Sequence, residues 1–218
     1  RIVFCHSFEE IISLDNLLEA WKEFIIDKRK RKDVQEFSLR FMDNILELHQ
    51  DLANHTYNHG SYQAFRINDP KPRQIHKSLV LDRLLHHALY RILYPYFNSK
   101  FIFDSYSCRL RKSTHRAINR LRSFARVASK NHTQTVWILK CDIRKFFATV
   151  DHDVLLKILA LRIQDENILW LLRQVVESFN TTSFVGIGLP LGEASTEFSR
   201  FAKHLNRSVT VPIIILFA

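Results

Sequence analysis

The stretch Val136-Trp-Ile-Leu-Lys-Cys-Asp-Ile-Arg-Lys-Phe-Phe147 carries the most information about the fold of this chain. Its β-branched, aromatic and aliphatic residues predict a buried strand that delivers Asp142 to its C-terminal end. An unpartnered carboxylate in an apolar setting is costly, so a metal ion beside Asp142 would account for its position. The alternative is an ordinary exposed aspartate at a strand end, and this stretch alone leaves both interpretations open.

The composition around this stretch indicates a globular, helix-rich chain with a polyanionic partner. The 218 residues are 46% hydrophobic and include only four glycines and five prolines, which favours long helices and few turns. Thirty-two basic against 22 acidic residues give a net charge of +10. Such a surface favours nucleic acid over an acidic small molecule, with a basic protein that has no such partner as the alternative.

The cysteines and the apolar runs indicate where the chain works. Cys5, Cys108 and Cys141 share no CxxC spacing, so neither a zinc site nor a disulfide framework is predicted. We therefore expect a reducing, cytoplasmic setting. No apolar run approaches the roughly 20 residues that a membrane span needs, and residues 1–12 lack the form of a signal peptide, so no membrane contact is expected.

Two helices separated by a basic run are predicted near the N-terminus. Ser13 can cap the first helix, whose apolar positions recur at helical spacing up to Ile25. The basic run consists of Lys28, Arg29, Lys30, Arg31 and Lys32. Five consecutive positive charges repel one another and lie either in solvent or on phosphates. Asp33 and Glu36 resemble a capping box that opens the second helix.

A basic hairpin follows a polar segment in which a metal at His55 and His59 is disfavoured, since the segment is poor in helix formers. Residues 62–66 and 71–75 flank the turn Asn68-Asp-Pro70, which predicts two short strands. The cationic side chains on this hairpin are Arg66, Lys71 and Arg73.

Four further helices complete the predicted elements. The first has a wide apolar face from Leu81 to Leu93 and is expected to close at Pro95. The second begins near Ser113 and is expected to bury an apolar face and to show arginines outside. Helices over 154–163 and roughly 165–179 follow the central stretch, and Gly186-Ile-Gly-Leu-Pro-Leu-Gly192 is the only glycine cluster. The buried positions expected in the second helix are Ala117, Ile118, Leu121, Phe124 and Ala128.

These pieces, in this order, resemble the fingers and palm of a reverse transcriptase of the bacterial group II intron or diversity-generating type. Phe65-Arg-Ile-Asn-Asp-Pro-Lys-Pro-Arg-Gln-Ile75 and the helix that follows it are similar to early fingers blocks. Asp142-Ile-Arg-Lys-Phe-Phe147 with Val150-Asp-His152 resembles the first catalytic palm motif, and Gly188-Leu-Pro-Leu-Gly192 resembles the start of the next.

The resemblance implies an α+β, helix-rich right-hand polymerase with a small antiparallel palm sheet and no thumb in this chain. It implies an N-terminal helical extension over 1–60, fingers over 61–130, a partial palm over 131–192 and an atypical tail over 193–218. Its implied partners are an RNA template, a DNA primer and a dNTP, with room for an accessory protein.

The resemblance also assigns site roles, through two Mg²⁺ ions about 3.5–4 Å apart that drive phosphoryl transfer. Asp142 would be the catalytic metal ligand, and the carbonyl of Ile143 a second ligand. Phe147 would act as a steric gate beneath the sugar, with a core aromatic as the alternative. The residues implied in triphosphate binding are Arg66, Lys71 and Arg73. Those implied in template or primer binding are Gly188, Pro190, Gly192 and the basic run 28–32.

The sequence departs from the family after Gly192. Family members carry a Tyr-x-Asp-Asp hairpin whose acids complete the metal site, but no Asp occurs here after Asp165 and no two Asp are adjacent. The chain is therefore either an incomplete or frame-shifted polymerase or one whose remaining acids come from elsewhere. The rival hypotheses are a non-catalytic RNA- or partner-binding module of the same ancestry and a splicing maturase fragment.

Overall fold

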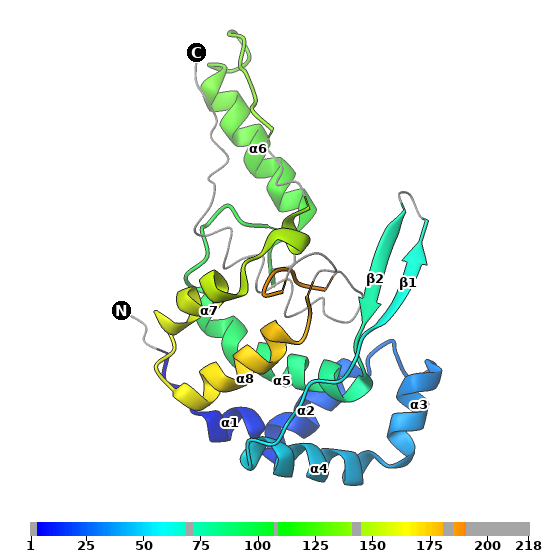
Figure 1. The fold of residues 1–218 in the computed structure, drawn as a ribbon. Helices are drawn as coiled ribbons and strands as arrows, with labels where there is room; N and C mark the ends of the chain where they lie inside the picture. The colour runs from blue at the N-terminus through cyan, green and yellow to red at the C-terminus, as the bar shows by residue number, and fades with distance from the viewer. Residues whose placement is uncertain (1–3, 69–71, 107–108, 141–144, 181–184, 191–218) are drawn as a thin grey trace.

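The computed structural model describes residues 4–68, 72–106, 109–140, 145–180 and 185–190 (Figure 1). Within these ranges the chain forms eight α-helices, one short 3-10 helix and one two-stranded antiparallel sheet. The helices are α1 (Phe8–Ile12), α2 (Leu14–Phe24), α3 (Lys32–Leu39), α4 (Phe41–Ala53), α5 (Val80–Asn98), α6 (Thr114–Ala128), α7 (His152–Ala160) and α8 (Glu166–Glu177). The strands are β1 (Gln63–Ile67) and β2 (Arg73–Lys77), and the 3-10 helix η1 spans Phe146–Thr149.

Helix α5 is the centre of the hydrophobic core. Leu84, Leu85, Leu89 and Leu93 on this helix are fully buried, and they belong to one cluster with apolar side chains of α1, α2, α4, α7 and α8. The expected close of the helix at Pro95 was wrong. The helix continues to Asn98 because a proline removes only one internal hydrogen bond, while the buried rings beyond it pack into the core.

The predicted helix starts are largely confirmed by capping hydrogen bonds. The Ser13 hydroxyl accepts from the backbone N–H of Asn16, and Ser113 and Asp151 cap α6 and α7 in the same way. The capping box at Asp33 was wrong, because α3 begins at Lys32 and has no side-chain cap. The Asp33 carboxylate instead contacts two cations outside its own helix, Lys77 and Arg83.

The buried strand predicted over 136–140 does not form. These residues lie outside any strand, and Trp137 and Ile138 are 69% and 58% exposed. A strand needs a hydrogen-bonded neighbour and cover for its side chains. Among the described residues, pairing is confined to β1 with β2 and to one bridge between Asp151 and Ile187. The expected palm sheet is therefore not seen in the part of the chain that the structure describes.

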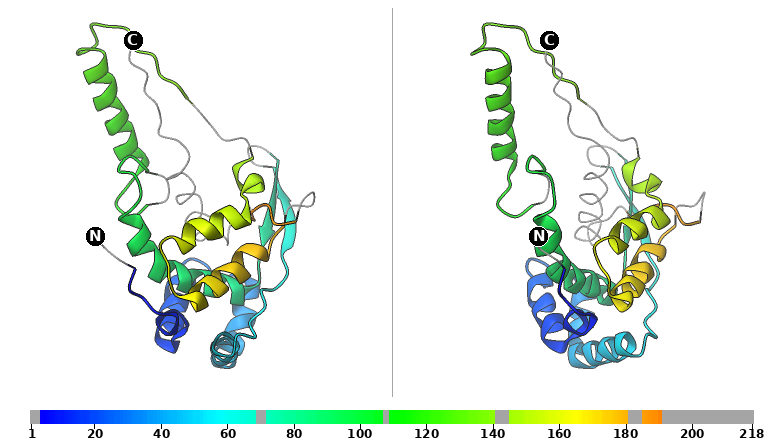
Figure 2. Two further views of the ribbon diagram at one scale, coloured as in Figure 1. Left: turned by 60° about the vertical axis from the view of Figure 1, so that its left-hand side comes forward. Right: turned by 90° about the vertical axis from the view of Figure 1, so that its left-hand side faces the viewer.

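Helix α6 forms where the sequence predicts it, but it buries no side chain. Figures 1 and 2 show it projecting from the rest of the described chain. Ile118 and Leu121, which were expected in the core, are 42% and 45% exposed. The helical spacing correctly indicated an apolar side, but spacing carries no information about whether another element covers that side.

The described chain is helix-rich with a small antiparallel sheet, as the α+β class requires, and that sheet is the hairpin predicted over 62–75. None of the helices in the described ranges combines the length and apolarity needed to cross a lipid bilayer.

A buried polar cluster joins α5 to the loop before β1. The Tyr57 hydroxyl donates to Asp82 Oδ1 at 2.7 Å, and the Nε2 atoms of His59 and His86 lie 3.2 Å apart. Tyr62 extends the cluster to α8, since its hydroxyl lies 3.3 Å from His59 Nε2 and 2.8 Å from the Ser178 hydroxyl. Burial, with smaller contributions from the charges of His59 and Arg83, lowers the pKa of His86 to about 3.

This cluster predicts a loss of stability under mild acid. A histidine whose folded pKa lies below its unfolded value of about 6.5 contributes stability above that pH, and the contribution is lost as pH falls. Between pH 7.5 and 5.5 the free energy of unfolding should drop by about 1.4 kcal/mol through His86 alone. Urea unfolding at the two pH values measures the drop.

Two variants isolate the contribution of His86. His86→Gln should flatten the pH dependence of the free energy of unfolding. His115→Gln, at an exposed position on α6, should leave that dependence unchanged. Equal pH slopes in the wild type and His86→Gln would contradict the assignment.

Candidate nucleotide and nucleic-acid interface

The hairpin places its two described arginines on opposite faces. Strands β1 and β2 pair with Arg66 opposite Gln74 and Ile67 opposite Arg73. Successive side chains in a strand point to opposite faces, so Arg66 shares its face with Gln74, and Arg73 shares the other with Ile67. Both arginines are exposed. Lys71, the third cation nominated from the sequence, lies outside the described residues.

The two faces of the hairpin look toward different neighbours. On the face of Arg66, the His76 ring packs against Phe179 just after α8, with ring centroids 4.8 Å apart. Burial lowers the pKa of His76. On the face of Arg73, Lys77 reaches the carboxylate of Asp33 at 2.8 Å. The Arg73 face therefore continues toward α3 and the basic run.

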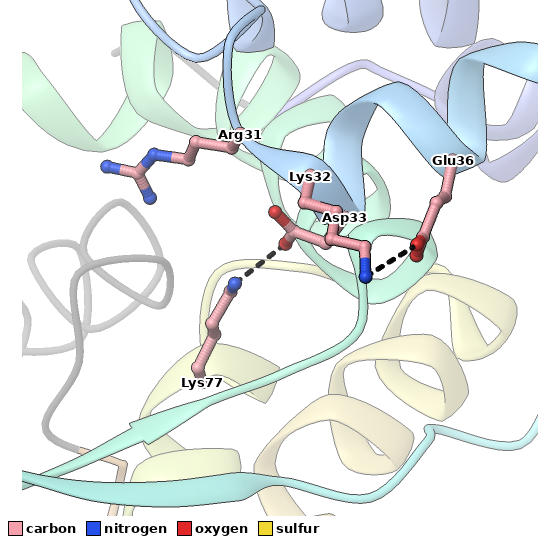
Figure 3. A pocket seen from close by; sticks show the side chains of 5 residues that line it. All are labelled: Arg31, Lys32, Asp33, Glu36 and Lys77. Carbon is pink, nitrogen blue, oxygen red and sulfur yellow. Dashed lines mark ion pairs between the residues drawn. The ribbon is translucent and has the colours of Figure 1, made fainter.

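A pocket of about 430 Å³ lies where the hairpin meets α3 (Figure 3). Its lining residues are Arg31, Lys32, Asp33, Glu36 and Lys77. Figure 3 shows Lys77 and Asp33 paired, and Lys32 paired with Glu36 at 3.8 Å. The pocket brings the end of the basic run and the base of the hairpin to one place, and two acids partly neutralise its cations.

The carboxylate of Asp33 is the charge centre of this region. It forms ion pairs with Lys77 and with the guanidinium of Arg83, whose side chain is 1% exposed. Burial alone would raise the pKa of Asp33, but the hydrogen bond from Lys77 and the charge of Arg83 outweigh it and hold the pKa below its usual range. The carboxylate therefore stays ionised and compensates a buried cation.

The five side chains of the basic run between α2 and α3 lie in different environments. Lys28 folds back, donating to the Phe24 carbonyl at 2.8 Å and lying over the Phe24 ring. Arg29 and Lys30 are exposed within the turn between the two helices. Arg29, Lys30 and Lys32 are therefore the solvated cations of the run, and Lys32 also lines the pocket together with Arg31.

The two sequence motifs assigned to the palm lie side by side. The carbonyl of Phe147 accepts from Leu189 N at 2.7 Å, and that of Val150 accepts from Gly188 N at 2.8 Å. His152 N donates to the Gly186 carbonyl at 3.0 Å. Both glycines have positive φ, 78° at Gly186 and 110° at Gly188, which explains why glycine stands at these positions.

His152 is a positioning residue that the sequence analysis did not single out. Its side chain is 2% exposed, and its Nε2 lies 2.6 Å from the Gly188 carbonyl. The histidine thereby fixes the glycine turn from a second side. The only signal in the sequence was its position at the end of the first palm motif.

The remaining nominated residues fall into two groups. Phe147 is half-buried, packs against the core and contacts the Phe146 ring at 5.2 Å, while Gly188 and Pro190 are buried. The nominated residues outside the described ranges are Asp142, Ile143 and Gly192. Within the described ranges, no group of three His, Cys, Asp or Glu side chains is placed to hold a metal ion.

The Asp33 ion pairs predict a strong effect of removing the carboxylate. Asp33→Ala leaves the buried Arg83 guanidinium uncompensated and should lower the free energy of unfolding by about 3–5 kcal/mol. Lys77→Met should cost less, because Lys77 is partly exposed and Arg83 keeps its partner. The measurement is urea unfolding at pH 7.

The matched control is Asp43→Ala, which removes an exposed ion pair with Arg40. Exposed pairs typically contribute no more than about 1 kcal/mol. A loss at Asp33 no larger than the loss at Asp43 would refute the role given to the buried pair.

Comparison with known proteins gives partial matches to longer chains. No protein-family model matches the chain. The Escherichia coli (strain K12) protein YkfC is 28% identical over 126 residues, which cover 55% of this chain and 32% of YkfC. The Arabidopsis thaliana protein Nuclear intron maturase 1, mitochondrial, is 30% identical over 91 residues, which cover 42% of this chain and 12% of the maturase.

Solved structures extend the similarity to most of the fold. In a partial Cas6-RT-Cas1–Cas2 complex, a chain matches 93% of this chain with a TM-score of 0.62 at 18% identity, and 34% of that chain is covered. A Cas6-RT-Cas1–Cas2 complex gives the same TM-score and identity, with 21% of its chain covered. The chain thus spans about a third or less of the length of these relatives. The shared fold confirms the coarser part of the resemblance, a reverse-transcriptase-like fold, while the group II intron or diversity-generating type stays a prediction.

Proposed function

We propose that this chain is the nucleic-acid- and nucleotide-binding part of an RNA-directed DNA polymerase. The observation that carries the proposal is the pairing of 147–152 with 186–190, three backbone hydrogen bonds between the two segments whose sequences resemble palm motifs. Asp142 stands five residues before Phe147 in the sequence and would supply one carboxylate ligand for Mg²⁺, with the Ile143 carbonyl beside it. The metal would activate the primer hydroxyl and stabilise the leaving pyrophosphate.

The basic residues support the binding part of the proposal. The +10 net charge, the exposed Arg29 and Lys30, and the pocket at the hairpin base all favour a phosphate-rich partner. RNA template, DNA primer and dNTP are the proposed ligands, as in the family that the sequence resembles. Protein partners are a further proposal, suggested by the Cas complexes in which the similar chains occur.

A second candidate is a non-catalytic RNA- or partner-binding module, including a maturase-like one. It is favoured by the resemblance itself, which assigns a single acid, Asp142, to the metal site within these 218 residues. A single carboxylate ligand compensates the charge of two Mg²⁺ ions poorly, because hard divalent ions take several oxygen ligands. The similarity to an intron maturase is compatible with this candidate.

Primer extension tests the enzymatic proposal. The purified 218 residues with Mg²⁺, dNTPs and a primed RNA template should bind the template but incorporate at most trace amounts of nucleotide. Any incorporation should be abolished by Asp142→Ala and retained in Asp153→Ala, an exposed acid in the first turn of α7.

Each part of the proposal has its own contradicting outcome. Robust DNA synthesis by this chain would refute its predicted weakness as an enzyme. Incorporation that survives Asp142→Ala would refute the metal-ligand assignment. No binding to RNA at 50 mM KCl would refute the nucleic-acid function, since phosphate contacts are strongest at low salt.

The geometry of the hairpin predicts unequal roles for its arginines. Because Arg66 and Arg73 lie on opposite faces, one triphosphate should contact only one of them. We expect Arg73→Gln to weaken binding of a fluorescent dNTP about tenfold, which corresponds to the loss of the binding free energy of one charge-assisted hydrogen bond. Arg66→Gln should change it less than twofold, and the double variant should match Arg73→Gln. Additive losses in the double variant would show that both guanidiniums reach the same ligand.

A further inference from the structure

Helix α6 carries charges of one sign only. Within Thr114–Ala128 the titratable side chains are His115, Arg116, Arg120, Arg122 and Arg126, and the helix contains no acid. No side chain of this helix is buried, and the helix projects from the rest of the described chain (Figure 2). The polymerase chemistry proposed above uses none of these residues. A further anionic ligand, bound by α6 itself, would account for so many cations on one projecting helix.

The arginines of α6 differ in how far their charge is compensated. Arg120 is neutralised by Asp104 at 2.9 Å and lies over the ring of Phe124 at 4.3 Å. Arg126 donates to the neutral side-chain oxygen of Asn131 at 2.8 Å, which leaves its charge uncompensated. Arg122 has no acidic partner among the described residues. Arg116 likewise donates only to a neutral group, the Arg111 carbonyl at 2.5 Å. The charge available to an external anion is therefore on Arg116, Arg122 and Arg126, of which the last two lie on the same side of the helix.

These two arginines belong to one exposed row. His115, Asn119, Arg122 and Arg126 follow one another at spacings of four, three and four residues, and all four are exposed. Such spacing aligns side chains along one side of a helix. At 1.5 Å per residue, Arg122 and Arg126 are about 6 Å apart along the axis, and the whole row covers about 16 Å. A rod of this kind fits an extended anion with repeating charges.

The chemistry of the row indicates RNA in duplex form. Guanidinium groups bind phosphate bidentately, and a duplex presents phosphates continuously along its backbone. The row contains no Phe, Tyr or Trp, and His115 is its single ring, so it offers only one small platform for the stacked bases of a single strand. Asn119 lies between the cations, and its amide can both donate to and accept from a 2′-hydroxyl, the group that distinguishes RNA from DNA.

We propose that the row His115–Asn119–Arg122–Arg126 of α6 docks on the backbone of an A-form RNA duplex, with the arginines on phosphates and Asn119 on a 2′-hydroxyl. The inference rests on the nucleic-acid binding proposed above and adds to it a second contact site, independent of Asp142. Because the row is on a projecting helix, a duplex bound there would extend beyond the compact part of the fold.

Fluorescence anisotropy with the 218-residue chain tests the docking site. The probes are a labelled 20-base-pair RNA duplex, the same sequence as duplex DNA, and one single RNA strand, each between 50 and 200 mM KCl. The double variant Arg122→Gln/Arg126→Gln should bind the RNA duplex about tenfold more weakly, and the slope of log Kd against log salt should fall by about 2. Asn119→Ala should reduce the preference for RNA over DNA duplex and leave the salt slope unchanged.

The matched control is Arg162→Gln/Arg173→Gln, which removes the same charge at two exposed positions outside α6. This control should bind within twofold of the wild type, and circular dichroism should give equal helix content for all variants. The docking site is refuted if the α6 and control variants bind the RNA duplex equally well, or if the wild type prefers duplex DNA or the single strand. Competition by poly-L-glutamate as effective as that by RNA would also refute it. If the wild type binds neither of the RNA probes, the proposed function itself is refuted.

Discussion

The buried guanidinium of Arg83 is the constraint on which the arrangement of the basic residues depends. Its side chain is 1% exposed, and it is held by the carboxylate of Asp33 on α3 and by the ring of Phe24 at the end of α2, 5.4 Å away. A buried cation is tolerated only if its charge is compensated at short range. Three helices must therefore keep their relative positions for Arg83 to remain in the core.

The same ion pair connects the core to the hairpin. Asp33 also binds Lys77 at the base of β2, so the carboxylate links α5, α3 and the sheet. On the same helix, Asp82 and His86 bind the loop that leads into β1. The start of β1 and the end of β2 are thus anchored to α5 by polar contacts, while the other ends of the two strands extend away from the compact part of the fold in Figure 1. Cations near those other ends can reach a ligand because the base is fixed.

The sequence predicted local features well because their causes are local. Ser13, Ser113 and Asp151 accept hydrogen bonds from N–H groups three residues on, and the two strands of the predicted hairpin, β1 and β2, are close neighbours in the sequence. The site was predicted less completely. The motifs at 147–152 and near 188 were assigned to one palm, but their backbone pairing depends on residues 34 to 42 apart in the chain and the clamp by His152 on residues 36 apart. No local pattern specifies such contacts.

The errors have a common physical origin. The apolar side of α6, the aromatic stretch at 136–140 and Asp33 all have a chemical character that the sequence shows directly. What each of them contacts depends on distant residues, and a carboxylate that resembles a cap is drawn instead to a buried cation 50 residues away. Periodicity in a sequence thus predicts which side of an element is apolar, but it does not predict whether that side is buried.

The distribution of charge gives the nucleic-acid hypothesis more support than the catalytic one. Acids of the described chain compensate cations where the fold needs them, as Asp33 does for Arg83 and Asp104 for Arg120. Cations that pair with no acid among the described residues lie at exposed places, among them the turn between α2 and α3, the hairpin and the outer row of α6. A catalytic centre for two Mg²⁺ needs the opposite, several carboxylates converging on one point. Binding of RNA therefore requires only what the described surface already presents, whereas synthesis of DNA requires Asp142 and further acids beside it.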